Sequence, residues 1–168
     1  MKLSIGRDQL LKPLQQVAGV VERKHTMPIL ANVLLRVSAD EISFTGTDLE
    51  VELVATHRLN VEQFVEAGEV TIPCRKLLDI CKSLPATATI ELSMDEQKLL
   101  IKSGRSRFSL ATLPAQDFPS LEEDAGAFSL NISQRNLKRL IEKTGFAMAQ
   151  QDVRYYLTGM LFEVTANQ

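Results

Sequence analysis

The sequence predicts an α+β fold in which antiparallel sheets carry two helices on one side. Apolar residues alternate or recur at helical spacing in the order strand, helix and three strands, and this order occurs twice within the first 113 residues. Residues 128–168 then repeat residues 1–41 at a constant offset of 127, without a gap. With 45% apolar and 24% charged residues, the composition is that of an ordinary globular protein able to bury a core.

The first β-α-β-β-β half begins with an alternating strand at 1–5, followed by a helical pattern at 7–21. Pro13 lies inside this pattern, so we expect the helix either to start late or to be kinked near Leu10. Strand-like runs follow at 29–37, 41–45 and 49–55, separated by turn signals at 39–40 and 46–48.

The second half has the same order. A strand at 69–72 precedes a helix at 74–84, which Pro73 opens and Pro85 closes. Three further strands are predicted at 89–93, 98–102 and 107–113. Two helices and about eight strands pack most economically with both helices on one side of antiparallel sheets. Residues 114–126 are predicted to be a linker, because they are rich in turn and acidic residues.

The repeat divides the chain into a first domain at 1–125 and the start of a second at 126–168. Matching apolar pairs include Leu3 with Leu130, Leu14 with Ile141 and Leu30 with Leu157. The second copy stops before the strands that would cover its helix, so we expect this domain to be incomplete. We also expect residues after Gly126 to be ordered only where another chain covers them.

Charge differs between the two copies. Residues 1–127 carry 14 Lys or Arg against 18 Asp or Glu, whereas residues 128–168 carry 5 against 3. The second copy opens with a basic helix that Ser133 can cap and Gly145 can end. Leu137, Leu140 and Ile141 form its apolar stripe, with Arg135, Lys138, Arg139 and Lys143 on the other side. These cations are either a solvated helix face or a surface for a polyanion.

Several classes of protein are disfavoured by the sequence. No apolar run approaches the roughly 20 residues of a membrane helix, and the first residues lack a signal-peptide core, so we expect a cytoplasmic protein. Cys74 and Cys81 fit buried thiols on one helix face better than a disulfide or zinc site. The two histidines, His25 and His57, lie in no metal-ligand or nucleophile motif. We therefore expect no catalytic residue, no metal and no cofactor.

Five segments together resemble the beta subunit of bacterial DNA polymerase III, the sliding clamp. They are Leu10-Leu11-Lys12-Pro13-Leu14-Gln15-Gln16-Val17, Met27-Pro28-Ile29-Leu30, Thr45-Gly46-Thr47-Asp48-Leu49-Glu50, Ser103-Gly104-Arg105-Ser106-Arg107-Phe108-Ser109-Leu110 and Gln151-Asp152-Val153-Arg154-Tyr155-Tyr156-Leu157. The resemblance covers essentially the whole chain. It implies a head-to-tail homodimer in which each protomer supplies three similar domains, with sheets outside and two helices per domain facing duplex DNA.

The resemblance implies sequence-independent DNA contacts by basic residues on or beside the helices: Arg7, Lys12, Arg75, Lys76, Lys82, Arg135, Lys138, Arg139 and Lys143. Arg23 and Lys24 occupy a basic loop that touches DNA in the family. At position 24 lysine replaces the commoner arginine, which keeps the charge but loses the forked donors of the guanidinium group. Gln151 matches another loop contact, and Tyr156 could stack on unpaired bases. For Tyr155 or Tyr156, a place in the core or a strand is the alternative.

Protein contacts are implied as well. The strand at 107–113 would cross the dimer interface, with Phe108 and Leu110 as apolar anchors and Lys76, Arg105 and Arg107 as ion-pair donors. Core packing is the alternative for Phe108. Arg154 and Leu157 match residues of the pocket that binds peptides of partner proteins.

The implied partners are the replicative polymerase catalytic subunit, the clamp loader, repair polymerases and ligase. Polymerase activity would then reside in those partners. We expect this chain alone not to close a ring. The competing interpretation is a truncated interaction module that never encircles DNA.

Overall fold

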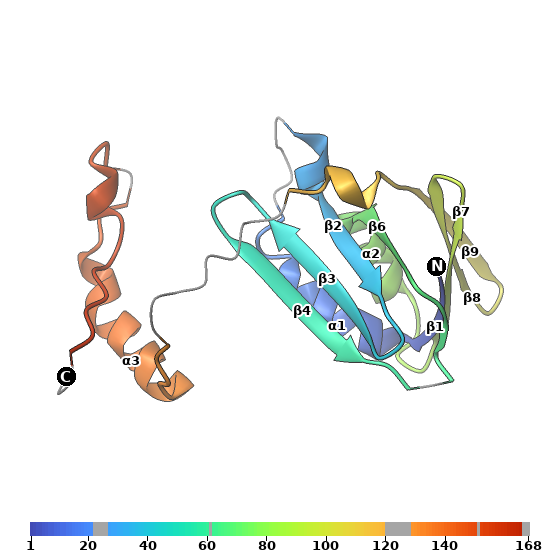
Figure 1. The fold of residues 1–168 in the computed structure, drawn as a ribbon, viewed down its shortest axis with the longest axis horizontal. Helices are drawn as coiled ribbons and strands as arrows, with labels where there is room; N and C mark the ends of the chain where they lie inside the picture. The colour runs from blue at the N-terminus through green and yellow to red at the C-terminus, as the bar shows by residue number, and fades with distance from the viewer. Residues whose placement is uncertain (22–26, 61, 120–128, 151, 166–168) are drawn as a thin grey trace. The chain divides into compact units, whose positions relative to one another are not determined.

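The computed structural model describes residues 1–21, 27–60, 62–119, 129–150 and 152–165. The chain divides into two compact units, Met1–Glu122 and Glu123–Gln168, which are considered separately (Figure 1). The boundary predicted at 125/126 falls among residues 120–128, outside the described part of the chain.

The first unit contains nine strands and two α-helices among its described residues. In chain order they are β1 (Lys2–Gly6), α1 (Arg7–Val17), β2 (Asn32–Val37), β3 (Glu41–Thr47), β4 (Glu52–Arg58), β5 (Phe64–Glu66), β6 (Gly68–Pro73), α2 (Cys74–Ser83), β7 (Thr89–Asp95), β8 (Lys98–Ser103) and β9 (Ser106–Ala111). Two short 3-10 helices, η1 (Pro28–Ala31) and η2 (Ala115–Asp117), complete it. This order confirms the predicted pair of β-α-β-β-β halves.

The two halves exchange their first strands. One sheet has the order β5-β1-β7-β8-β9 and the other β4-β3-β2-β6, so β1 joins the second half and β6 joins the first. All pairings between these strands are antiparallel, with Leu3 opposite Leu92 and Val33 opposite Ile72. The exchange ties the halves together, because neither sheet is complete without a strand from the other half.

A single core lies between the helices and the inner faces of both sheets. Leu10, Leu14 and Val17 of α1 are fully buried, and Leu77 and Cys81 of α2 are equally inaccessible. Both helices lie on the same side of the sheet that contains β2 and β3 (Figure 1). The predicted α+β packing is confirmed.

A smaller cluster covers the opposite face of β2. Ile29, Leu30, Leu34 and Phe118 are buried together there. The chain reaches this face by leaving β9 and pairing Leu113 with Thr71 of β6 through two backbone hydrogen bonds of 3.1 and 3.3 Å. The Thr71 hydroxyl donates a further bond to the carbonyl of Leu113, and the Asn32 amide donates to the Thr71 hydroxyl. β2 is therefore buried on both faces where it begins.

Helix α1 differs from the expectation raised by Pro13. The helix begins at Arg7, so a late start is wrong, and Pro13 lies buried within it. The Gln9 side chain accepts the Gly6 N–H at 3.1 Å and so satisfies a donor at the start of the helix. The helix ends at Val17 instead of residue 21, although the following turn keeps Ala18 and Val21 buried.

Two strands begin clearly later than expected. The strand expected at 49–55 begins at Glu52, because residues 48–51 form a turn in which Leu49 has a φ of 76°. The Asp48 carboxylate accepts the backbone N–H groups of Glu50 and Val51, which stabilises that turn. The strand expected from residue 29 starts at Asn32, after a 3-10 turn that Pro28 opens.

The second unit contains helix α3 (Gln134–Thr144) and two 3-10 turns, η3 (Gly145–Ala147) and η4 (Tyr155–Leu157), with no strand among its described residues. Ser133 caps α3 by accepting the N–H of Asn136, and Gly145 follows its last residue, as predicted. Positions 134–144 are also those of α1 shifted by 127, so the repeat extends to the helix boundaries.

Candidate nucleic-acid interface

Helices α1 and α2 pack side by side in the first unit and expose basic residues on their outward faces. Lys12 of α1 and Arg75, Lys76 and Lys82 of α2 are exposed. Each helix buries an apolar stripe, so its polar positions are directed away from the core. Among the residues that the structure describes, these four cations form no ion pair, which leaves them available to phosphates.

Arg7 is placed differently from the other predicted DNA contacts. Its Nε donates to the carbonyl of Cys81 at 2.9 Å, and its Nη1 lies 2.7 Å from the Asp8 carboxylate. The side chain is only 18% exposed. Arg7 therefore satisfies a carbonyl near the C-terminal end of α2, where a cation is favourable, and its charge is already balanced.

Helix α3 is the most basic helix described. Its four cations, Arg135, Lys138, Arg139 and Lys143, are exposed, and Glu142 is its single acidic residue. Lys138 pairs with Glu142 at 3.8 Å, one turn apart. Arg139 occupies the repeat position of Lys12, so a cation recurs at the same place on both helices.

Three predicted DNA contacts, Arg23, Lys24 and Gln151, lie outside the described residues. Tyr156 is described and is 68% exposed, and Tyr155 is 82% exposed. Their rings meet edge to face with centroids 6.0 Å apart. Neither lies in a core or a strand within this chain, so the exposed rings are accessible for stacking.

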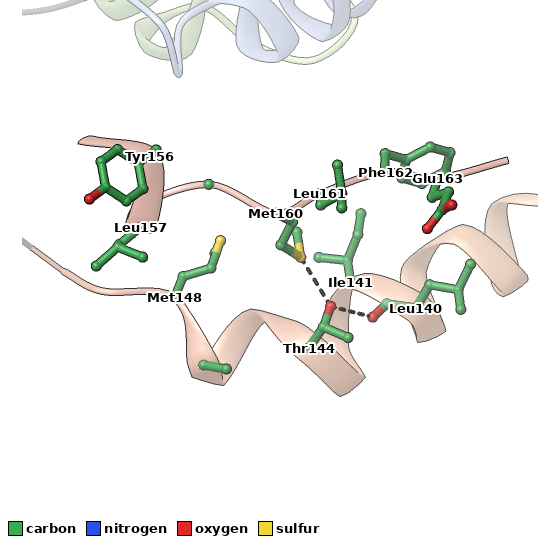
Figure 2. Close-up of a pocket in the computed structure, with 12 residues that line it drawn as sticks. Leu140, Ile141, Thr144, Met148, Tyr156, Leu157, Met160, Leu161, Phe162 and Glu163 are labelled. Carbon is green, nitrogen blue, oxygen red and sulfur yellow. Dashed lines mark hydrogen bonds between the residues drawn. The ribbon is translucent and has the colours of Figure 1, made fainter. Parts of the chain in front are cut away.

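The second unit also contains an apolar groove of about 470 Å³. It is lined by the α3 residues Leu140, Ile141 and Thr144, and by residues 147–148, 156–157 and 159–163 (Figure 2). The Thr144 hydroxyl lies 2.9 Å from the carbonyl oxygen of Leu140 and 3.0 Å from the Sδ of Met160. At the repeat positions in α1, Pro13, Leu14 and Val17 are buried, so the floor of this groove corresponds to the core of the first unit.

Arg154 and Leu157, the predicted pocket residues, lie at the start and end of the η4 turn. Leu157 contributes to the groove and is 38% exposed. Arg154 forms a two-pronged ion pair with Asp152, from Nε to Oδ1 at 3.0 Å and from Nη2 to Oδ2 at 2.9 Å. Hydrogen bonds from the Arg154 side chain and backbone hold the pKa of Asp152 below its ordinary value, and Asp152 raises the pKa of Arg154.

The predicted dimer residues lie on β9, on the turn before it and on α2. Strand β9 is the last strand of its sheet and has an unpaired edge within the first unit, with Arg105 and Arg107 exposed beside it. Leu110 is buried in the core of its own unit, and Phe108 packs partly against that core. The open edge and the arginines therefore remain available to a partner, whereas Leu110 already has its packing partners.

The described residues give little chemistry of other kinds. No group of three His, Cys, Asp or Glu side chains suited to a metal occurs among them. Burial raises the pKa of the Cys74 and Cys81 thiols to about 11. None of the helices in the described part of the chain is long and apolar enough to cross a membrane.

Sequence reasoning missed two features of this surface. It did not predict the hydrogen bond from Arg7 to the Cys81 carbonyl, because the two residues are 74 positions apart and leave no local signal. It also passed over Asp152, although an Asp two residues before an Arg in a turn-rich segment is a recognisable Asx-turn signal.

Two family models match the chain. One, described as the N-terminal domain of the DNA polymerase III beta subunit, matches residues 1–122. The other, described as the central domain of the same subunit, matches residues 131–168. The matches fall on the two units that the structure separates.

Curated relatives and solved structures agree with these matches. The chain is 62% identical to the beta sliding clamp of Pseudomonas putida over 99% of its own length and 45% of that protein. It is 50% identical to the Escherichia coli beta sliding clamp over its full length and 45% of that protein. The chain thus spans less than half the length of these relatives.

Among solved structures, the DNA polymerase III beta subunit of Pseudomonas aeruginosa is similar with a TM-score of 0.90 and 59% identity. That match covers 95% of this chain and 43% of the other. The Caulobacter crescentus polymerase III beta structure matches with a TM-score of 0.88 and 43% identity, over 95% of this chain and 42% of the other.

Proposed function

This chain belongs to the family of the DNA polymerase III beta subunit, and we propose on that basis that it forms part of a ring-shaped sliding clamp around duplex DNA. The ring would be a head-to-tail homodimer with three similar domains in each protomer. Residues 1–122 supply one domain and residues 131–168 belong to the next. As a processivity factor, the clamp tethers the replicative polymerase to its template.

The recurrence of a cation on the repeated helix is the observation that carries this proposal. Lys12 and Arg139 occupy equivalent positions in α1 and α3, and both are exposed. Further exposed cations surround them on α2 and α3, although residues 1–127 are net acidic. Exposed cations that recur at the same position of repeated helices suit a lining that meets phosphates at regular intervals. Phosphate contacts are independent of sequence, which a sliding protein requires.

The proposed DNA contacts comprise the exposed helix cations, Tyr156 and, outside the described residues, Arg23, Lys24 and Gln151. Arg7 would also support this surface by holding α2, because its Nε and one Nη1 donor are engaged by the Cys81 carbonyl and Asp8. Retention on DNA comes from closure of the ring, so individual contacts can remain weak.

The proposed protein contacts lie on two surfaces. The open edge of β9, with Arg105 and Arg107, and Lys76 of α2 meet the partner protomer across the dimer interface. Arg154 and Leu157 contribute to the pocket that takes peptides of the polymerase catalytic subunit, clamp loader, repair polymerases and ligase. The clamp itself is not catalytic, and it acts in the cytoplasm.

The decisive experiment uses the full-length protein that contains this sequence, loaded by its clamp loader onto nicked circular DNA. The DNA-bound fraction is isolated on a sizing column, and the circle is then cut at a single site. We expect the protein to stay on the closed circle and to leave the linear form, because a ring can slide off a free end.

The same assay separates the alternatives. Equal retention on circular and linear DNA would indicate an ordinary DNA-binding protein. Loss from both forms would favour an interaction module that does not encircle DNA. A linear DNA whose ends are blocked by bulky bound proteins is the control, and it should restore retention.

A further inference from the structure

One short segment of the second unit contains candidate contacts for two different ligands. Tyr156 is a candidate DNA contact, whereas Arg154 and Leu157 are candidate peptide contacts. A free arginine beside a DNA-binding surface would attract phosphates regardless of its role in peptide binding. In the structure, Arg154 is not free, because it is paired with Asp152.

Asp152 holds Arg154 through three hydrogen bonds. Oδ1 accepts both the Arg154 backbone N–H at 2.9 Å and its Nε at 3.0 Å, and Oδ2 accepts Nη2 at 2.9 Å. The backbone bond forms an Asx turn, and the side-chain bonds form a planar fork. The lowered pKa of Asp152 and the raised pKa of Arg154 are consistent with a charged pair.

The pairing changes what Arg154 can bind. Two of its five side-chain N–H donors are engaged by Asp152 and three remain. Its positive charge is balanced at contact distance, in contrast to Arg135, Arg139 and Lys143, which form no ion pair within the described residues. The remaining donors suit a neutral acceptor such as a peptide carbonyl, while a phosphate gains little from a neutralised pair.

The turn also fixes the residues that follow. The N–H of Leu157 donates to the carbonyl of Arg154 at 2.9 Å, and the carbonyl of Leu157 accepts the N–H of Ala149 at 3.0 Å. The Thr158 hydroxyl closes the turn on the carbonyl of Tyr155. Asp152 thus braces the start of a hydrogen-bonded segment that presents Arg154 and Leu157 together.

We propose that Asp152 is a positioning and selectivity residue, which aims Arg154 at neutral peptide acceptors and withholds its charge from DNA phosphates. This inference rests on the proposed clamp function and assigns different ligands to different cations of the second unit. Arg154 serves the peptide site because Asp152 neutralises it, and the unpaired cations of α3 serve the DNA.

The test uses the full-length clamp with Asp152→Asn, Arg154→Gln and the double variant. Asparagine can still accept the Arg154 backbone N–H, so Asp152→Asn removes the carboxylate charge and can keep the turn. The control is Glu69→Gln, which breaks a comparable exposed pair between Arg36 and Glu69 and adds the same charge in the first unit. The probes are a labelled polymerase-tail peptide and a short primed duplex, each titrated by fluorescence anisotropy at several salt concentrations.

We expect Asp152→Asn to weaken peptide binding by roughly threefold or more, because the Arg154 side chain is no longer held in position. The same change should tighten DNA binding and steepen the slope of log affinity against log salt by about 0.9, the value for one added phosphate contact. In the Arg154→Gln background, Asp152→Asn should change the affinity for neither ligand. Glu69→Gln should leave peptide binding and the DNA slope as in the wild type.

The proposal is overturned if Asp152→Asn leaves the affinities for peptide and DNA unchanged. It is also overturned if both affinities fall, since that result would indicate a collapsed turn. An effect that persists without Arg154 would overturn it equally. Failure of the clamp function itself is recognised separately, because wild-type protein would then remain on linear DNA or fail to load on circles.

Discussion

Gly46 allows strand β3 to pass close to the end of helix α1. An added Cβ would lie 3.1 Å from Cγ2 of Val21 and 3.2 Å from the carbonyl oxygen of Val17. We expect Gly46→Ala to lower the free energy of unfolding by about 1–3 kcal/mol, because a backbone carbonyl cannot rotate away from the new methyl group. Urea denaturation followed by circular dichroism measures this change.

Gly19→Ala is the matched control for that measurement. No atom lies within 4 Å of the position that its Cβ would occupy. Its substitution should therefore alter the free energy of unfolding by less than about 1 kcal/mol. Equal destabilisation by the two alanines would contradict the close approach at Gly46.

The two buried thiols should be unreactive in the folded protein. Cys74 and Cys81 have pKa values raised from 9.0 to about 11 by burial, so the thiolate is scarce below pH 9. We expect both to resist a thiol reagent at pH 8 until urea unfolds the protein, when both should react. Rapid labelling without denaturant would contradict their burial.

The same pKa values predict a change of stability with pH. Between pH 9 and 11 the unfolded thiols lose protons that the folded protein retains, so the unfolded state binds fewer protons there. Stability contributed by the neutral buried thiols is complete below pH 9 and should fall as the pH rises toward 11. Cys74→Ala/Cys81→Ala protein should lose less stability over that interval.

Local sequence signals predicted residue roles only where both partners are close in the chain. The Ser133 cap could be predicted because it acts on Asn136, three residues away. The role of Arg7 could not, since the carbonyl of Cys81 reaches it only after folding.

At the level of elements, α1 and α3 provide a comparison of one helix in two environments. Leu14 of α1 is fully buried, whereas Ile141 at the equivalent position of α3 is 45% exposed. In the 168-residue chain, Leu14→Ala should cost about 2–5 kcal/mol and Ile141→Ala much less than half of that. The free energy of unfolding from urea titrations measures both.

The outcome of that pair is informative in the full-length protein too. If the rest of the central domain covers α3 as the sheets cover α1, Ile141→Ala should become as costly as Leu14→Ala. A persistently small effect would mean that the repeat does not extend to the packing around the helix.

The order of helices and strands could be predicted because periodicity depends on local sequence. Their boundaries were harder to predict, because turns and long-range pairing also determine them. The start of β4 was placed too early, since the Asp48 turn and the positive φ of Leu49 interrupt a run whose apolar residues alternate as in a strand. Strand β5 was missed. It is three residues long and is defined by its pairing with β1, a contact about 60 residues away in sequence.

For the whole chain, the two units should differ in stability. The first buries its helices against two sheets, whereas α3 has 11 residues and exposes Leu140 and Ile141. A helix of this length is marginal without packing. Amide hydrogen exchange in the 168-residue chain should therefore be faster in α3 than in α1 by roughly a hundredfold or more. Equal protection would show that the second unit has found a cover of its own.

The presence of two units could be predicted from sequence alone, because a repeat at fixed offset needs no structure to detect. The exchange of first strands between the halves could not, since β1–β7 and β2–β6 pairing depends on contacts that periodicity does not encode. The recurring cations of α1 and α3 support a surface that faces DNA, whereas the proposed closure into a dimeric ring depends on the family.

The strap from Leu113 to Phe118 has a mechanical consequence. Force applied to the second unit would enter the first through this segment. The force would meet the paired backbone bonds between Leu113 and Thr71, and the buried Phe118 ring, before it reached β9. β9 and its open edge would therefore bear tension only after those anchors had failed.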